Sequence, residues 1–258
     1  NTTGNDNTAL GKDAMSANTT ASNNTAVGKS AMAANTTGSE NTAVGRGALD
    51  ANTTAEDNTS IGYNSMSANT TAGDNTAVGA RAMEANTTGS ANTTIGSRAM
   101  EANTTGVQNT AVGKDAMKAN TTGERNVAVG ETALDSNTTG IRNVAIGRSA
   151  LQGTQTASYN VGVGHSAMGD TTTGHNNTAV GNGALNSTTT GNNNVGIGTQ
   201  ALSSSATASG EFTLGGGDIT NLRCNDTSIS SLSDSRDKTN IVDIPLGLTF
   251  INTVRPVA

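Results

Sequence analysis

Residues 24–40 read Asn-Thr-Ala-Val-Gly-Lys-Ser-Ala-Met-Ala-Ala-Asn-Thr-Thr-Gly-Ser-Glu, and residues 41–57 repeat this pattern as Asn-Thr-Ala-Val-Gly-Arg-Gly-Ala-Leu-Asp-Ala-Asn-Thr-Thr-Ala-Glu-Asp. The unit begins with an Asn that recurs twelve times at every 17th position, from Asn7 to Asn194. A fixed period without insertions indicates a repeat architecture. We number the positions of the unit 1 to 17 from this Asn, and the repeats 1 to 12 along the chain.

Three columns of the unit carry its larger apolar or β-branched residues. Position 4 is aliphatic in every repeat, position 5 is always Gly, and position 9 is Met or Leu and holds every Met of the chain. Position 2 is Thr in the first seven repeats and Val in four of the last five. This exchange of near-isosteric residues favours an inward strand position, so Val144 and Ile146 are expected to point inward and Ala145 outward.

The same assignment predicts the direction in which the small residues of the unit point. Positions 3 and 8 are mostly Ala, as at Ala26 and Ala31, and on this interpretation these alanines point outward and allow other chains to approach closely. Position 14 is Thr in all twelve repeats, from Thr20 to Thr207. We expect its hydroxyl to point inward or to bond within a turn.

Two architectures compete for a unit of this length. The Ala-Met-x-Ala-Asn segment could start a helical turn, but so short a unit, with a Gly, an Asn and two Thr, cannot hold two helices and their connection. We therefore predict an all-β fold, a parallel β-solenoid of twelve 17-residue coils in a homotrimer, with a short C-terminal neck. At about 4.8 Å per coil the rod would be about 58 Å long.

A single coil of this kind cannot be stable alone. Each large buried side chain contributes about 1.5 to 3 kcal/mol, whereas ordering the backbone costs about 1 to 2 kcal/mol per residue. Neighbouring coils must therefore supply the difference, together with other subunits. The period fails after Ala208, so we expect a rod over 1–208 and a closing coil or neck over 209–232.

Composition and charge exclude several function classes. Only 33% of the residues are hydrophobic and 2% aromatic, so a conventional enzyme core is not expected. The net charge is −6 without a basic block, which argues against nucleic acid as a partner. Cys224 is the one cysteine, and no apolar run is long enough to span a membrane. We expect no cofactor, no metal and no membrane contact.

The unit Asn-[Thr/Val]-Ala-[Val/Ile]-Gly resembles the head repeats of trimeric autotransporter adhesins and, more closely, the Asn-Thr-Thr-Gly repeats of phage and bacterial tail-fibre-domain proteins. The resemblance covers about residues 1 to 208. It implies left-handed parallel β-rolls that pack as homotrimers. The adhesin heads have repeats shorter than this unit, so their corners differ from those expected here.

A second resemblance lies at the C-terminal end. Ser-Asp-Ser-Arg-Asp-Lys-Thr-Asn-Ile at 233–241 and Arg-Pro-Val at 255–257 are similar to the opening of the intramolecular chaperone domain of phage tail spikes and endosialidases. The resemblance implies that 233–258 begin a domain that helps the shaft to trimerise and then releases itself by one cleavage. Ser233 would be the nucleophile and Lys238 its base, which requires burial to lower the Lys pKa from about 10.4.

These features together lead to one expected function and two alternatives. The expected function is structural and adhesive: the distal tail fibre of a phage virion, which attaches to a glycan or protein receptor on the host surface. Its other partners would be tail or virion proteins, bound through a segment before Asn1. The alternatives are a trimeric adhesin or secreted filament at a bacterial surface, and an ice-binding solenoid. No separate enzymatic activity is expected.

Weaker motifs have structural explanations. Gly-x-Gly-x-x-Ala at 162–167 and 196–201 matches a dinucleotide fingerprint, but no βαβ unit follows it. His165 and His175 lack neighbouring carboxylates in the sequence and are expected on the surface. The Asn-x-Thr sequons, which begin with Asn18 in repeat 1, are interpreted as turn residues.

Overall fold

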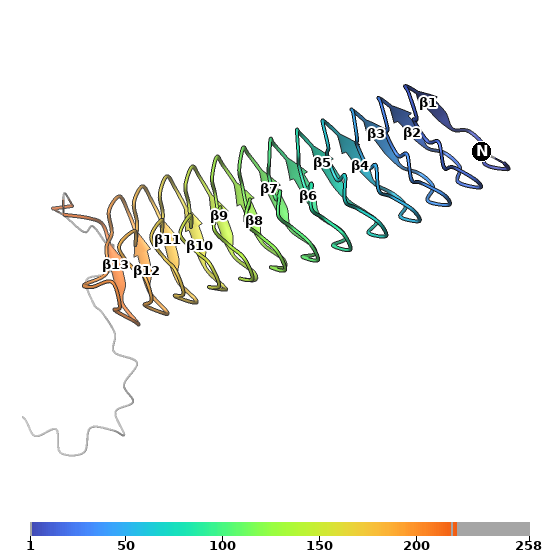
Figure 1. Ribbon diagram of the computed structural model, residues 1–258. Coiled ribbons are helices and arrows are strands. Elements are labelled where there is room, and N and C mark those ends of the chain that lie inside the picture. The colour runs from blue at the N-terminus through green and yellow to red at the C-terminus, as the bar shows by residue number, and fades with distance from the viewer. Residues whose placement is uncertain (1, 218, 221–258) are drawn as a thin grey trace, which may run out of the picture. The chain divides into compact units, whose positions relative to one another are not determined.

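The computed structural model describes residues 2–217, 219 and 220, and within them it contains strands and turns but no helix. The predicted all-β parallel solenoid is confirmed (Figure 1). Each repeat forms one coil with a single three-residue strand, and we number the coils as the repeats. The strands are β1 (Thr8–Leu10), β2 (Thr25–Val27), β3 (Thr42–Val44), β4 (Thr59–Ile61), β5 (Thr76–Val78), β6 (Thr93–Ile95), β7 (Thr110–Val112), β8 (Val127–Val129), β9 (Val144–Ile146), β10 (Val161–Val163), β11 (Thr178–Val180), β12 (Val195–Ile197) and β13 (Phe212–Leu214).

The strands form one parallel sheet in sequence order (Figure 1). Each residue pairs with the residue 17 positions later, so Ala26 lies beside Ala43 and Val27 beside Val44. The same register continues past the twelfth repeat, where Val195 pairs with Phe212. Identical positions therefore stack in columns along the whole described rod.

The predicted direction of the strand side chains is wrong. In β9, Ala145 is fully buried, whereas Val144 is half-buried and Ile146 is exposed. Position 3 points into the coil in β2 to β12, and positions 2 and 4 point outward. The position-8 alanines, such as Ala31, are also buried rather than outward.

The reason is the narrow interior of the coil. The position-9 Met or Leu side chains fill it from the far side, and each of them is fully buried from Met32 to Leu185. Little room is left opposite them, so position 3 is small. At Gly196 even a Cβ atom would lie 2.7 Å from Cγ of Leu185.

Left-handed backbone conformations let the chain turn tightly in every coil. Residues at positions 7 and 17 of every coil, and at position 9 of coils 1 to 11, have positive φ, and most of them are not glycine. Met32, at the centre of the core, has a φ of 52°. The Gly at position 5 has no substitute, because Gly28 has a φ of 135° and a Cβ there would lie 2.5 Å from the carbonyl oxygen of Gly45.

The position-1 asparagines form a buried hydrogen-bonded ladder. Oδ1 of Asn24 accepts from both the backbone N–H (2.9 Å) and Nδ2 (3.2 Å) of Asn41 in the next coil. Nδ2 of Asn41 also donates to the carbonyl oxygen of Ala55 (2.9 Å). These bonds satisfy amide groups that would be costly to bury unpaired.

A second ladder runs through position 12. Nδ2 of Asn52 donates to Oδ1 of Asn35 (2.8 Å) and to the carbonyl oxygen of Ala55 (3.1 Å), so both ladders meet at the same carbonyl. The bonds between successive position-12 amides run from Asn35 to Asn137, after which position 12 becomes Thr. At that change, Oδ1 of Asn137 and Oγ1 of Thr154 are buried and have no hydrogen-bond partner.

The threonine pair at positions 13 and 14 behaves differently from our expectation. The first Thr donates its hydroxyl to the backbone carbonyl of the next coil, as in Thr36 to Thr53 (3.0 Å). The second Thr, present in all twelve repeats, is exposed in every coil, so its side chain points neither inward nor into a turn. Nothing in the structure explains why position 14 is always Thr.

Coil 12 departs from the pattern. Leu202, at position 9, is 43% exposed instead of buried. After coil 12, Glu211 stands 17 residues beyond Asn194 where the next Asn would be, and its carboxylate accepts hydrogen bonds from the backbone N–H and the hydroxyl of Ser204. These bonds lower the pKa of Glu211. The regular core therefore ends at coil 11, although the strand ladder continues to β13.

Candidate interaction surface

The outward side chains of positions 2 and 4 form a continuous strip on the outer face of the sheet, which we call the outer strip. It runs along β1 to β13, which lie side by side in Figure 1. Seven of its twelve position-4 residues are exposed aliphatics, such as Ile61 (38% exposed), Ile95 (43%) and Ile197 (41%), and the other five are half-buried valines. The sequence pattern predicts these columns but places them in the interior, where the structure places position 3 instead.

The outer strip has two different halves. In coils 1 to 7 position 2 is Thr, so each strand presents one hydroxyl and one aliphatic side chain. In coils 8, 9, 10 and 12 position 2 is Val, so each strand presents two aliphatic side chains. The half from β8 to β12 is therefore the more apolar one.

A parallel sheet with an open apolar face is unusual. Parallel sheets occur almost only with both faces covered, because their strands are apolar on both sides. Here the inner face is covered by the position-9 column, and no described residue covers the outer face. Positions 2 and 4 hold no charged residue in any coil, so a covering partner would meet no ionic group on the strip.

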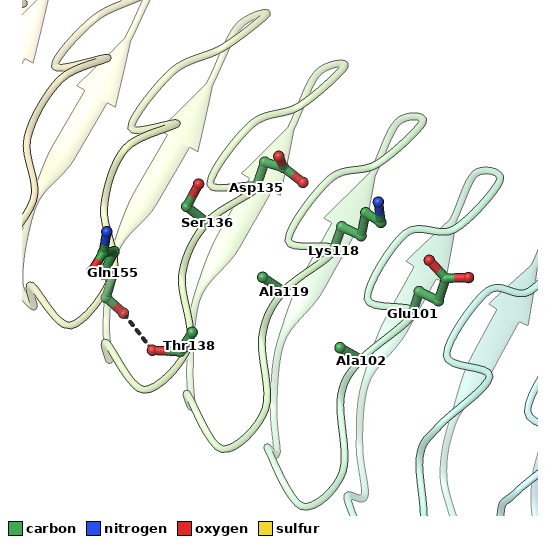
Figure 2. A pocket seen from close by; sticks show the side chains of 8 residues that line it. All are labelled: Glu101, Ala102, Lys118, Ala119, Asp135, Ser136, Thr138 and Gln155. Carbon is green, nitrogen blue, oxygen red and sulfur yellow. Dashed lines mark hydrogen bonds between the residues drawn. The ribbon is translucent and has the colours of Figure 1, made fainter.

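A second surface feature is a groove of about 530 Å³ over coils 6 to 9 (Figure 2). One wall is made by the position-10 side chains Glu101, Lys118 and Asp135. The floor is made by the small position-11 residues Ala102, Ala119 and Ser136. The opposite rim holds Thr138 and Gln155, where the Thr138 hydroxyl donates to the Gln155 carbonyl (3.0 Å).

Ion pairs surround this groove. Arg81 contacts Glu101 at 3.7 Å. Arg98 forms a two-pronged pair with Asp115, with nitrogen–oxygen distances of 2.9 and 3.0 Å. The carboxyl group of Asp135 is half-buried, and burial raises its pKa more than the nearby Lys118 lowers it.

Several residues singled out from the sequence cannot be placed. Ser233 and Lys238, predicted to be a self-cleaving pair, lie outside the described residues, and so does Cys224. The domain boundary at residue 232 lies there too. The self-cleavage therefore stays a prediction.

The histidines and sequons have local structural roles. His165 and His175 are exposed, and Nδ1 of His175 accepts a hydrogen bond from the backbone N–H of Ser158 (3.0 Å). Among the described residues no group of three or more His, Cys, Asp or Glu is placed to hold a metal. The sequon residue Asn35 is fully buried, and its Nδ2 donates to Gly38 inside the rod (2.9 Å).

No family model, curated protein or solved structure matches this chain. In the part of the chain that the structure describes, no helix is long and apolar enough to cross a membrane.

Proposed function

We propose that residues 1–208 form the rod of a homotrimeric attachment fibre, of the kind that phage tails carry, and that the outer strips of three chains face one another. The observation that carries this proposal is the uncovered apolar strip along a parallel sheet. The charge-free columns at positions 2 and 4 support it, because three copies can meet there without burying an ionic group.

The period of the outer strip favours a second copy of this chain as its partner. The strip repeats its side chains at the spacing of the coils, about 4.8 Å, along the whole described rod. A partner that contacts every coil must have the same period. Another copy of this chain has that period.

The adhesive part of the proposal concerns the remaining surface. With the outer strips facing one another, the groove and the exposed Thr column at position 14 stay available to a receptor on a host cell. The segment that contains Ser233 and Lys238 would align the chains during assembly, since stacked coils of similar sequence can otherwise pair one coil out of register.

The test is the absolute mass of the purified chain by light scattering after size-exclusion chromatography. We expect three times the chain mass for the wild type. The double substitution Val144→Asp and Ile146→Asp places two charges in the strip and should lower the mass toward that of one chain. The matched control, Thr139→Asp with Thr156→Asp, changes exposed residues in coils 8 and 9 and should keep the threefold mass.

The same samples test attachment. Fluorescently labelled rod is incubated with a panel of bacterial cells, and retained fluorescence is measured. A single-chain mass for the wild type would contradict the homotrimer, and absence of retention on every strain would contradict the adhesive role.

A further inference from the structure

The groove over coils 6 to 9 has the size and the polar groups of a ligand site. Its volume of about 530 Å³ lies in the range typical of small-molecule sites. Figure 2 shows Glu101, Lys118 and Asp135 in a row on successive coils, with Ala102, Ala119 and Ser136 beside them. The row offers carboxylate and ammonium groups above a floor of small side chains.

Two charges in this row lack a direct partner. Glu101 is paired with Arg81 at 3.7 Å. Lys118 and Asp135 form no ion pair or side-chain hydrogen bond among the described residues, although the charge of Lys118 acts on Asp135. The Asp135 carboxyl is half-buried without a direct partner that would compensate for its loss of water, and this burial raises its pKa. Hydrogen-bond donors from a ligand would supply that compensation.

The order of charges selects the ligand class. Negative, positive and negative groups alternate from one coil to the next, so a polyanion or a polycation would meet repulsion at every second contact. A hydroxyl group can donate to Glu101 or Asp135 and can accept from Lys118. A neutral chain rich in hydroxyls therefore satisfies the whole row.

The spacing and the floor favour an extended ligand. Neighbouring coils are about 4.8 Å apart, close to the length of one sugar unit in an extended chain. The methyl groups of Ala102 and Ala119 leave room for the apolar faces of sugar rings. Position 10 is uncharged in coils 1, 2, 4 and 9 to 12, as at Ala33, Ser67 and Gly169, so an unbroken run of charges in this column belongs to the middle of the rod.

We propose that this groove binds a neutral linear glycan that lies along the rod axis, with about one sugar unit per coil. The proposal rests on the attachment function above and names the receptor class. Glu101 and Asp135 accept from sugar hydroxyls, Lys118 donates to sugar oxygens, and Gln155 contributes its amide at the far end.

The test measures binding of the full chain to three immobilised hexasaccharides: chitohexaose, cellohexaose and maltohexaose. We expect binding to at least one of them. Ala119→Trp fills the floor of the groove and should weaken that binding by about ten-fold or more. The matched control Ala34→Trp alters the same column in coil 2 and should leave binding within about two-fold of wild type.

A second variant distinguishes loss of the binding site from misfolding of Ala119→Trp. Lys118→Ala with Asp135→Asn removes both unpaired charges without adding bulk and should give a similar loss. The inference is wrong if none of the three hexasaccharides binds, or if Ala34→Trp weakens binding as much as Ala119→Trp. If glycan binding is absent while the threefold mass and cell attachment persist, the glycan site is contradicted and the proposed attachment function is not. If cell attachment is absent as well, the proposed function falls with it.

Discussion

Coils 1 to 8 and coils 9 to 12 share one strand register but are stabilised differently. In coils 2 to 8 of the first group, the Asn residues at position 12 form an amide ladder in the interior. In the second group the ladder is replaced by Thr154, Thr171 and Thr188, and position 12 of coil 12 is the exposed Ser205. In coils 8, 9, 10 and 12 the outer strip has valine at position 2, whereas coil 11 keeps Thr178. The early coils have more hydrogen bonds inside, and the late coils have more apolar surface outside.

This difference shows that one backbone can be supported from either side. An Asn in the ladder links two coils through its side chain, whereas Thr171 makes a single bond, to the carbonyl of Thr188 (2.8 Å). A late coil therefore has less internal support. Its apolar strip compensates only when something covers it, so the late coils should depend more on self-association than the early coils.

The largest effect is expected from breaking the amide ladder in an early coil. Asn103→Leu keeps the volume of the side chain but removes the donor to Oδ1 of Asn86 (2.8 Å) and the acceptor for Nδ2 of Asn120 (2.8 Å). Two buried groups lose a partner at about 1 to 3 kcal/mol each, so the loss should be about 2 to 6 kcal/mol. Chemical denaturation followed by circular dichroism measures it.

The corresponding change in a late coil supplies the control. Thr171→Val removes one hydroxyl bond and should cost only about 1 kcal/mol. Equal losses in Asn103→Leu and Thr171→Val would contradict the distinction between the two groups of coils.

A smaller effect is expected from repairing the junction. Thr154→Asn should extend the ladder by one coil, because the new amide can donate to the unpartnered Oδ1 of Asn137. We expect a gain of about 1 kcal/mol in the free energy of unfolding. Thr188→Asn is the control without a gain, since the position-12 residue of the preceding coil is Thr171. A loss of stability in Thr154→Asn would show that the junction has no room for an amide.

The smallest effect concerns Asp135 in coil 8, beside the junction. Burial raises its folded-state pKa above 3.8, so the native state binds a proton more tightly than the unfolded chain and the ionised carboxylate lowers stability at neutral pH. This penalty disappears as the pH falls from the folded pKa to below 3.8. Lys118 and Arg98 oppose the shift, and Asp115 adds to it.

Asp135→Asn should therefore raise the melting temperature slightly at pH 7 and leave it equal to wild type at pH 3. Thermal melts of both proteins at the two pH values measure the difference. Glu56→Gln, at an exposed carboxyl in coil 3, is the matched control without an expected gain. A lower melting temperature of Asp135→Asn at pH 7 would mean that the attraction to Lys118 outweighs burial.

The architecture could be predicted because it depends on period alone. An Asn at every 17th position, with a Gly at position 5 of each unit, leaves stacked coils as the arrangement that pairs like with like. The direction of the strand side chains could not be predicted from the sequence. Val-Ala-Ile at 144–146 alternates large and small apolar residues, so a strand of this sequence can turn either the Val and Ile side chains or the Ala side chain inward. What decides it is the Met or Leu from the other wall of the coil, a contact that local alternation does not reveal.

The candidate surfaces were missed for related reasons. The outer strip was assigned to the interior because aliphatic residues are usually buried. The groove was missed because Glu101, Lys118 and Asp135 stand in a variable column, as solvent-exposed residues do. One signal was available: these three charges follow one another at steps of 17, each followed by Ala or Ser. The interior ladder from Asn35 to Asn137 also has a signal, because position 12 is Asn in every repeat from Asn18 to Asn137.

The orphaned pair at Asn137 and Thr154 has a mechanical consequence. The coils are coupled in series, and their hydrogen bonds run along the rod, so a pull on its two ends loads every interface with the same tension. Under equal tension, interfaces with fewer hydrogen bonds between the coils separate first. Under such a load the interface between coils 8 and 9 should separate before the interfaces between coils 2 and 8, which keep the amide bond that this junction lacks.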